Sequence, residues 1–399
     1  MNSVLVGDGT SLSAILQAVR NARAARPSVR LALATLVNVE GSSYRQPGAR
    51  LLVDAEQRVL AGAISGGCLE GDVAARAAEV CQTNAPIMLR YDLREDLETI
   101  WGFGAGCDGI AHVLLEPLAD VSWLQNAHDA MMRRTRPVLV TVFGSTNSQA
   151  ALGEHELVEY TAVSEQPMHI KSALATGQPC VGVELRGGDA RNVLSEPLNA
   201  PVALHLIGAG RSAEAFATIA SAMGWHVTVI DHRPALLADL KLPDAVRRVE
   251  RWPEQGLNDL PVDGRTVVAL LTHIFETDVA WLQKLLASPL AYIGVLGSRN
   301  RAARLIEQLT TDGFSVTDEM LRCLFAPIGL DLGGETPESI ALAGVAEMEA
   351  VLHERPGGFL RSRQSPIHTR TPVPLVVTDA IDATLDSCVV LRDQRDHPV

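Results

Sequence analysis

The feature that most constrains the fold is a glycine turn in the second half of the chain. Segment 202–207 is apolar, residues 208–213 have the sequence GAGRSA, and residues 212–223 have a helical pattern. Gly208 permits a tight turn, and Gly210 lets a phosphate approach the backbone. The turn therefore predicts a strand–turn–helix unit of the Rossmann type, with helix N–H groups facing an anion.

Strand-like and helical segments then alternate, which predicts a doubly wound parallel sheet. The strand-like segments are 227–230, 267–271, 291–296 and 323–325. Asp231 ends the first of them, where a carboxylate can accept from a ribose 2′-OH. The alternative is that the glycines only permit close packing, in a domain that has lost or changed its ligand.

Further candidate residues follow other strands of this sheet. Arg211 and Ser212 open the helix after the glycine turn. Ser298 and Arg299 open another helix, where N–H groups, a hydroxyl and a guanidinium would meet a second phosphate. An ordinary capped helix with surface arginines explains that segment equally well. His273 ends a further strand and is either a proton donor or ligand contact, or a loop residue bonded to backbone.

The first half of the chain predicts a mixed α+β domain. Strand-like and helical segments alternate around two glycine-rich loops, at 65–68 and 102–109. Segment 119–200 is polar and turn-rich with short strands. We therefore expect four regions: an α+β domain, a strand-rich connecting segment, a Rossmann-like domain and a C-terminal extension, at 1–118, 119–200, 201–357 and 358–399.

Cys68 and Cys107 each follow a glycine-rich turn, which lets a ligand approach the backbone. Gly66 and Gly67 precede Cys68, and a helix follows it, so the helix dipole favours the thiolate. The nearby acidic residues Glu70 and Asp72 oppose that effect. A thiolate suits soft metal centres and sulfur transfer. The alternative for each cysteine is a buried, inert side chain.

The segment 41–50 carries Arg45 and Arg50 among glycines and hydroxyl groups. Two guanidinium groups on one loop are able to clamp an anion. A structured surface turn explains the same composition. The residues alone do not decide between the two.

Composition bears on partners and location. The 399 residues carry a net charge of −13, which argues against non-specific binding to nucleic acid or an anionic membrane. We find no apolar run of the roughly 18–20 residues that a membrane span needs, and no basic segment typical of a secretory signal. The six cysteines are scattered without a CxxC pair, so we expect a reduced, cytoplasmic protein without a zinc site.

Taken together, these motifs resemble the XdhC/CoxI family from about residue 12 to residue 352. The motifs that carry the resemblance, in chain order, are Gly41-Ser42-Ser43, Pro47-Gly48-Ala49, Ser65-Gly66-Gly67-Cys68-Leu69-Glu70-Gly71, Gly104-Ala105-Gly106-Cys107, Gly208-Ala209-Gly210, Val229-Ile230-Asp231-His232-Arg233, Thr272-His273, Gly294-Val295-Leu296-Gly297-Ser298 and Pro327-Ile328-Gly329-Leu330-Asp331-Leu332-Gly333. The set and its order are far more specific than any one motif. Asp108 departs from the family, which often has glycine there.

The resemblance implies an accessory protein for the maturation of a molybdenum hydroxylase such as xanthine dehydrogenase. Such proteins bind the molybdenum cofactor (molybdopterin), support its sulfuration with a cysteine desulfurase, and insert it into the apo-enzyme. The resemblance supports a role for Cys68, and to a smaller degree for Cys107. We expect a homodimer that turns over no substrate of its own. The client enzyme stays open.

Joining the chemistry to the resemblance gives a spatial hypothesis. A cleft between the two domains would hold the cofactor, with its phosphate at 208–212 and Cys68 near molybdenum. The main alternative is an NAD(P)-dependent oxidoreductase, in which Asp231 binds the ribose and His273 is the acid–base group. A third is a docking scaffold with an empty Rossmann domain.

Overall fold

The structure is a computed structural model that divides into two compact units between Ala200 and Pro201. It describes residues 12–41, 43–93, 109–146, 152–159, 166–364, 375 and 381–382. We call the described residues up to Ala200, with 375 and 381–382, the N-terminal unit, and residues 201–364 the C-terminal unit. Segment 119–200 lies in the same unit as residues 12–118.

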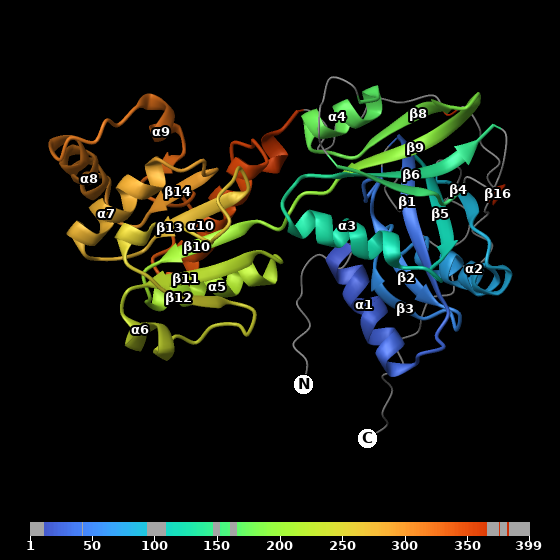
Figure 1. The fold of residues 1–399 in the computed structure, drawn as a ribbon, viewed down its shortest axis with the longest axis horizontal. Helices are drawn as coiled ribbons and strands as arrows, with labels where there is room; N and C mark the ends of the chain where they lie inside the picture. Colours follow the sequence, from blue (N-terminus) through green and yellow to red (C-terminus); the bar gives the residue numbers. More distant parts are fainter. Residues whose placement is uncertain are drawn as a thin grey trace. The chain divides into compact units, whose positions relative to one another are not determined.

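The C-terminal unit is a six-stranded parallel sheet with helices on both faces (Figure 1). In chain order its elements are β10 (Ala203–Ile207), α5 (Arg211–Ala222), β11 (His226–Asp231), α6 (Pro234–Asp239), β12 (Arg247–Glu250), η3 (Pro253–Gln255), β13 (Thr266–Leu270), α7 (Phe275–Leu286), β14 (Tyr292–Val295), α8 (Arg299–Thr311), α9 (Asp318–Arg322), β15 (Leu324–Phe325), α10 (Pro337–Leu352) and η4 (Leu360–Ser362). The strand order is β12-β11-β10-β13-β14-β15, all parallel. This is the Rossmann order 3-2-1-4-5-6, so the predicted fold class is confirmed.

Each face of this sheet has its own apolar core. Phe216 of α5 and Met348 of α10 are fully buried on one face with Leu206 of β10. Trp281 of α7 and Leu305 of α8 lie in the core of the other face. The inner strands β10, β11, β13 and β14 are buried on both faces, which explains why each is a nearly continuous apolar run in the sequence.

The N-terminal unit contains two sheets and four helices among the described residues (Figure 1). In chain order its elements are α1 (Leu12–Ala25), β1 (Leu31–Gly41), β2 (Arg50–Asp54), β3 (Val59–Gly62), α2 (Glu70–Thr83), β4 (Ile87–Asp92), β5 (Gly109–Pro117), α3 (Ser122–Met132), β6 (Val138–Ser145), β7 (His155–Val158), α4 (Met168–Thr176), β8 (Cys180–Arg186), β9 (Asp189–Pro197) and β16 (Ile381–Asp382). The strand orders are β16-β4-β5-β1-β2-β3 and β7-β6-β9-β8. The first sheet is antiparallel except for the edge strand β16, and the predicted mixed α+β character is confirmed.

Helices and the second sheet cover the first sheet. Helix α2 packs on one face through side chains such as Val73 and Val80. Ile15 of α1 and Leu124 of α3 pack on the other face, together with Leu139 of β6. The second sheet is thus part of the same core, and helix α4 covers its far side.

Strand β9 shows why segment 119–200 looked less regular in the sequence. Its Asn192, Ser195 and Glu196 are polar, yet all three are buried. Ser195, for example, shares a 2.7 Å hydrogen bond with Nδ1 of His169 in α4. Polar side chains that are satisfied inside the protein remove the alternation of polar and apolar residues by which strands are predicted.

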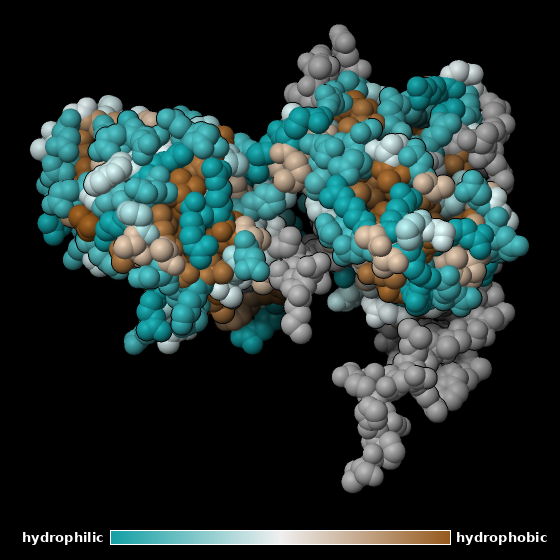
Figure 2. Space-filling view, turned by 60° about the horizontal axis from the view of Figure 1, so that its bottom comes forward, coloured by the Kyte–Doolittle hydropathy of each residue, from teal (hydrophilic) through white to brown (hydrophobic). Residues whose placement is uncertain are grey.

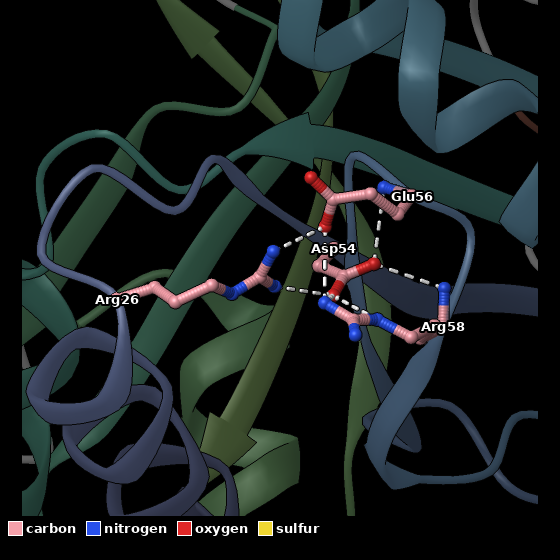
Figure 3. A network of polar contacts seen from close by, with 4 residues as sticks. All are labelled: Arg26, Asp54, Glu56 and Arg58. Carbon is pink, nitrogen blue, oxygen red and sulfur yellow. Dashed lines mark hydrogen bonds and ion pairs between the residues drawn. The ribbon is translucent and has the colours of Figure 1, made fainter.

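A polar network fixes the turn between β2 and β3 (Figure 3). The fully buried Asp54 carboxylate accepts from Arg26 at 2.9 Å, from Nε of Arg58 at 2.8 Å, and from the backbone N–H groups of Glu56 and Arg58 at 3.0 Å. Burial raises the pKa of Asp54, but the bonds from Arg58 outweigh it and leave that pKa lowered. The network joins the end of α1 to this hairpin.

Hydrophilic residues cover most of each unit on the face in Figure 2, and hydrophobic residues show through in separate patches. This agrees with each unit having apolar cores of its own. In the described ranges, we find no helix with the length and apolar character that crossing a membrane requires.

Candidate functional site

Cys68 lies in a short loop between β3 and α2 that Glu70 holds in place. One carboxylate oxygen of Glu70 accepts from the backbone N–H groups of Ile64 and Ser65, at 3.1 and 2.8 Å. The other oxygen accepts from the Ser65 hydroxyl and from the N–H of Leu69, the latter at 3.2 Å. A single carboxylate therefore holds the backbone on both sides of Cys68.

The same loop leaves its backbone open where the glycines lie. The Ser65 hydroxyl oxygen accepts from the N–H of Gly67 at 3.1 Å. Gly67 has φ +114°, which favours glycine, and nothing lies within 4 Å of the place where a Cβ would stand. At Gly66 the nearest atoms belong to the Tyr44 ring, at 3.8 and 3.9 Å. A ligand can therefore approach the backbone beside the half-buried Cys68.

The neighbouring segment 43–49 places an aromatic ring and a cation beside this loop. Tyr44 is 69% exposed, and the guanidinium carbon of Arg45 lies 5.8 Å from its ring centroid. Arg50 is instead buried in a bidentate ion pair with Glu196, at 2.9 and 2.5 Å. The hypothesis that Arg50 clamps an anion is therefore wrong, because Arg50 anchors this segment to strand β9.

We expect Glu70→Gln to destabilise the chain by about 1–3 kcal/mol. The amide replaces one carboxylate oxygen with an NH₂ group, so backbone N–H groups that donate to that oxygen in the wild-type chain lose their acceptor. Urea unfolding measures this difference. Glu79→Gln is the matched control, since Glu79 is exposed on the same helix. Equal stabilities of the two variants would contradict the role assigned to Glu70.

In the C-terminal unit the glycine turn meets the neighbouring strand. A Cβ on Gly208, which has φ +114°, would lie 2.9 Å from the backbone nitrogen of Thr272. At Gly210 nothing lies within 4 Å of the Cβ position. Gly208 therefore allows two strand ends to approach, whereas Gly210 leaves room in front of α5 for a ligand.

This contrast predicts different effects for two alanine substitutions. Gly208→Ala should cost at least the roughly 1–3 kcal/mol of an unfavourable backbone conformation, because its methyl group also meets backbone atoms. Gly210→Ala should change the free energy of unfolding by less than about 1 kcal/mol. Urea unfolding of the two variants is the test, and equal losses would refute it.

Asp231 is 4% exposed, and its carboxylate is occupied by the protein. It accepts from the N–H of Ala209 at 2.7 Å and from the Arg233 backbone N–H, Nε and one terminal nitrogen at 2.9, 2.9 and 2.8 Å. Burial raises the pKa of Asp231, but the bonds from Arg233 and Ala209 outweigh it and leave that pKa lowered. A ribose hydroxyl would have to displace one of these donors, so the geometry disfavours the predicted ribose contact.

A second buried carboxylate organises the ends of β13 and β14. Asp278 is 1% exposed and accepts from the Thr272 hydroxyl and, at 2.5 Å, from the Arg301 guanidinium. Burial raises the pKa of Asp278 and prevails over the bonds from Thr272 and Arg301. The Ser298 hydroxyl caps α8 by accepting from the N–H of Arg301 at 3.2 Å. The capped-helix interpretation of this segment therefore has direct support.

The structure brings the predicted residues together within each unit. Gly66, Gly67 and Cys68 share one loop. Eight predicted residues lie at or just beyond the carboxyl ends of β10, β11, β13 and β14, where parallel sheets bind ligands: Gly208, Gly210, Arg211, Ser212, Asp231, His273, Ser298 and Arg299. Cys107 lies outside the described residues. The Cys68 loop and the turn at Gly208 belong to different units, and a cleft shared by them stays a prediction.

Sequence reasoning missed the residues that hold these loops. Ser65, Arg233 and Arg301 each lie within a few residues of a predicted site residue, and Glu70 was considered only for its charge. Glu70 directly follows the glycine turn that begins at Ser65, and Asp231 lies two residues before Arg233, so sequence proximity is the signal that could have found these two pairs. Nothing local points to the contact between Arg301 and Asp278, which are 23 residues apart.

Within the described ranges the candidate metal ligands are single thiols rather than a metal cage. Cys68, Cys81, Cys180 and Cys323 are thiols rather than disulfides. In the part of the chain that the structure describes, no group of three or more His, Cys, Asp or Glu side chains is arranged to hold a metal ion. Such a site suits a bare ion poorly. It better suits a metal that arrives with its own ligands and needs only one more thiolate.

Comparisons with known proteins agree with this arrangement. Residues 204–348 match the family model described as the XdhC Rossmann domain, and residues 24–92 match that of the XdhC and CoxI family. A Bacillus subtilis protein named as a probable subunit of xanthine dehydrogenase is 29% identical over 79% of this chain and 91% of its own length. The Escherichia coli molybdenum cofactor insertion chaperone PaoD is 24% identical over 81% and 84%. A solved structure described as a xanthine dehydrogenase from Bacillus halodurans, 26% identical, superposes with a TM-score of 0.67 over 86% of this chain and 96% of that one.

Proposed function

The chain belongs to the XdhC and CoxI family, and on this premise we propose that it binds the molybdenum cofactor and inserts it into an apo molybdenum hydroxylase. The names of two relatives support the proposal, one as a probable part of xanthine dehydrogenase and one as an insertion chaperone. The observation that carries it is the Cys68 loop, whose backbone is held by hydrogen bonds to Glu70 and Ser65 and is open at Gly66 and Gly67.

The residues of this loop fit the cofactor as cargo. Molybdopterin supplies sulfur ligands for its own metal, so one protein thiolate from Cys68 is enough to hold molybdenum. The exposed Tyr44 ring offers a stacking surface for a flat bicyclic ring system. The Arg45 guanidinium beside it suits a negatively charged ligand. Cys107 is a second candidate cofactor contact.

In the C-terminal unit we propose that the turn at Gly208 and Gly210, with Arg211 and Ser212, receives a phosphate of the cofactor. His273, Ser298 and Arg299 would flank it at the same edge of the sheet. Asp231 would act indirectly, because its carboxylate holds the Ala209 N–H of the turn.

The proposed partners follow from the cargo. A cysteine desulfurase would supply the sulfur atom for the sulfuration of the bound cofactor, and the apo-enzyme would then receive it. A homodimer is the expected assembly. Because sulfur transfer needs thiols kept reduced, we place this work in the cytoplasm.

The proposal is tested by co-expressing the full chain with candidate apo molybdenum hydroxylases. The sulfurated cofactor in each purified client is measured with and without the chain. We expect one client to gain sulfurated cofactor and activity only when the chain is present. If no molybdenum hydroxylase gains either, the proposal is wrong.

An NAD(P)-dependent oxidoreductase is the second candidate, favoured by the strand order and by the turn at Gly208. It predicts turnover of NADH or NADPH with a small substrate and no dependence on Cys68. Steady-state absorbance at the nicotinamide band separates the two candidates.

A further inference from the structure

An exposed aromatic pair lies at the carboxyl edge of the C-terminal sheet. Strands β11 and β12 are parallel, so His232, next after β11, and Trp252, two residues after β12, emerge at the same edge. Their ring centroids are 4.3 Å apart with planes tilted by 35°. Trp252 is 54% exposed. The edge therefore presents an indole ring, supported by an imidazole, to solvent.

The loop that carries Trp252 is well held. The backbone N–H of Trp252 donates to the side-chain oxygen of Gln255 at 2.9 Å. Next to it, the buried Arg251 guanidinium donates to the carbonyl oxygens of Gly256 and Asn258, at 3.2 and 2.5 Å. An exposed ring on a fixed loop loses little conformational entropy when a flat ligand stacks on it.

Beside this pair the edge presents a cation in place of a carboxylate. Arg233 uses Nε and one terminal nitrogen to bind Asp231. A guanidinium carries five N–H groups, so three remain for another acceptor, and the Arg233 side chain is 40% exposed. In Rossmann folds an arginine at this place accommodates a phosphate on the ribose, whereas an accessible carboxylate binds the ribose hydroxyl.

We propose that this edge binds a nucleotide that carries a phosphate on the ribose 2′ position, with the base stacked on Trp252 and the ribose phosphate bound by Arg233. Stacking on an aromatic ring suits any base, and the guanidinium selects the additional phosphate. A protein partner would also cover an exposed tryptophan, but it gives no reason for a cation held at this edge. The nucleotide site uses no residue of the Cys68 loop, and it adjoins the turn at Gly208 through Asp231.

Calorimetry on the full chain tests the stacking surface, with adenosine 2′,5′-bisphosphate as the probe. We expect Trp252→Ala to weaken its binding about tenfold or more, and Trp252→Phe to keep most of the affinity. Phe359→Ala is the control, since Phe359 is 74% exposed elsewhere in the unit. No binding of the probe at millimolar concentration, or equal binding by Trp252→Ala, would overturn the proposal.

A second pair of measurements tests Arg233. The wild-type chain should bind the bisphosphate about tenfold more tightly than AMP. Arg233→Gln should reverse this preference, because it removes the cation and releases the Asp231 carboxylate to accept from a ribose hydroxyl. A purely structural arginine would weaken both ligands equally. That result would refute recognition of the ribose phosphate. So would a wild-type chain that binds AMP, CMP or GMP as tightly as it binds the bisphosphate.

Discussion

Cys68→Ser is expected to abolish most of the activity that a client molybdenum hydroxylase gains from the chain. Loss of an outer-shell partner costs a metal site about 10- to 100-fold in affinity or activity, and loss of a direct sulfur ligand should cost at least as much. The hydroxyl fills the same place in the loop, so the hydrogen bonds that Glu70 and Ser65 accept from the backbone should persist. The variant should therefore fold normally and fail in cofactor transfer.

The measurement is the activity and the sulfurated cofactor content of the client after co-expression with each variant. Cys180→Ser is the matched control, because Cys180 is a half-buried thiol in the same unit that donates to the carbonyl oxygen of Val181. Equal melting temperatures of the two variants would show that the loop is intact. If Cys68→Ser activates the client as well as Cys180→Ser does, the thiol has no part in transfer.

The architecture of the C-terminal unit could be predicted because its determinants are local. The turn at Gly208 lies between a buried strand and a helix, and the later strands β11, β13 and β14 are short, largely apolar runs. The segment 189–197 was harder, because its polar residues are buried among partners far away in the sequence. Strand β12, with the sequence RRVE, is missed for a similar reason: an edge strand with exposed arginines has no apolar alternation.

The candidate site could be predicted in its positions more than in its contacts. Glycine turns mark where a ligand approaches, and that information is local to the sequence. The sequence does not show which carboxylate accepts hydrogen bonds from which turn, because that depends on the positions of the side chains in the folded chain. Asp231 illustrates this, since its place at the end of β11 suggested a ribose contact, whereas both of its carboxylate oxygens accept hydrogen bonds from Arg233, two residues away.

Arg50 and Glu196 illustrate the limit most clearly, and they support the largest stability effect that we expect. They are 146 residues apart, both are buried, and each side chain is less than a tenth exposed. Arg50→Met leaves the Glu196 carboxylate buried without its cation, which costs about 3–5 kcal/mol in such pairs. Urea unfolding should show this loss. Arg186→Met, in an exposed pair with Glu156, is the control and should cost about 0–1 kcal/mol.

The double variant Arg50→Met/Glu196→Leu decides what the ion pair contributes. Replacing both buried charges with apolar side chains of similar size is often neutral, so the double variant should recover most of the stability lost in Arg50→Met. Arg50 also donates to the carbonyl oxygen of Gly48 at 2.9 Å, and this bond stays lost in the double variant. We therefore expect a chain that is stable but holds the segment with Tyr44 and Arg45 less firmly, and client activation should fall although the fold persists. Full activation by the double variant would show that this segment needs no anchor.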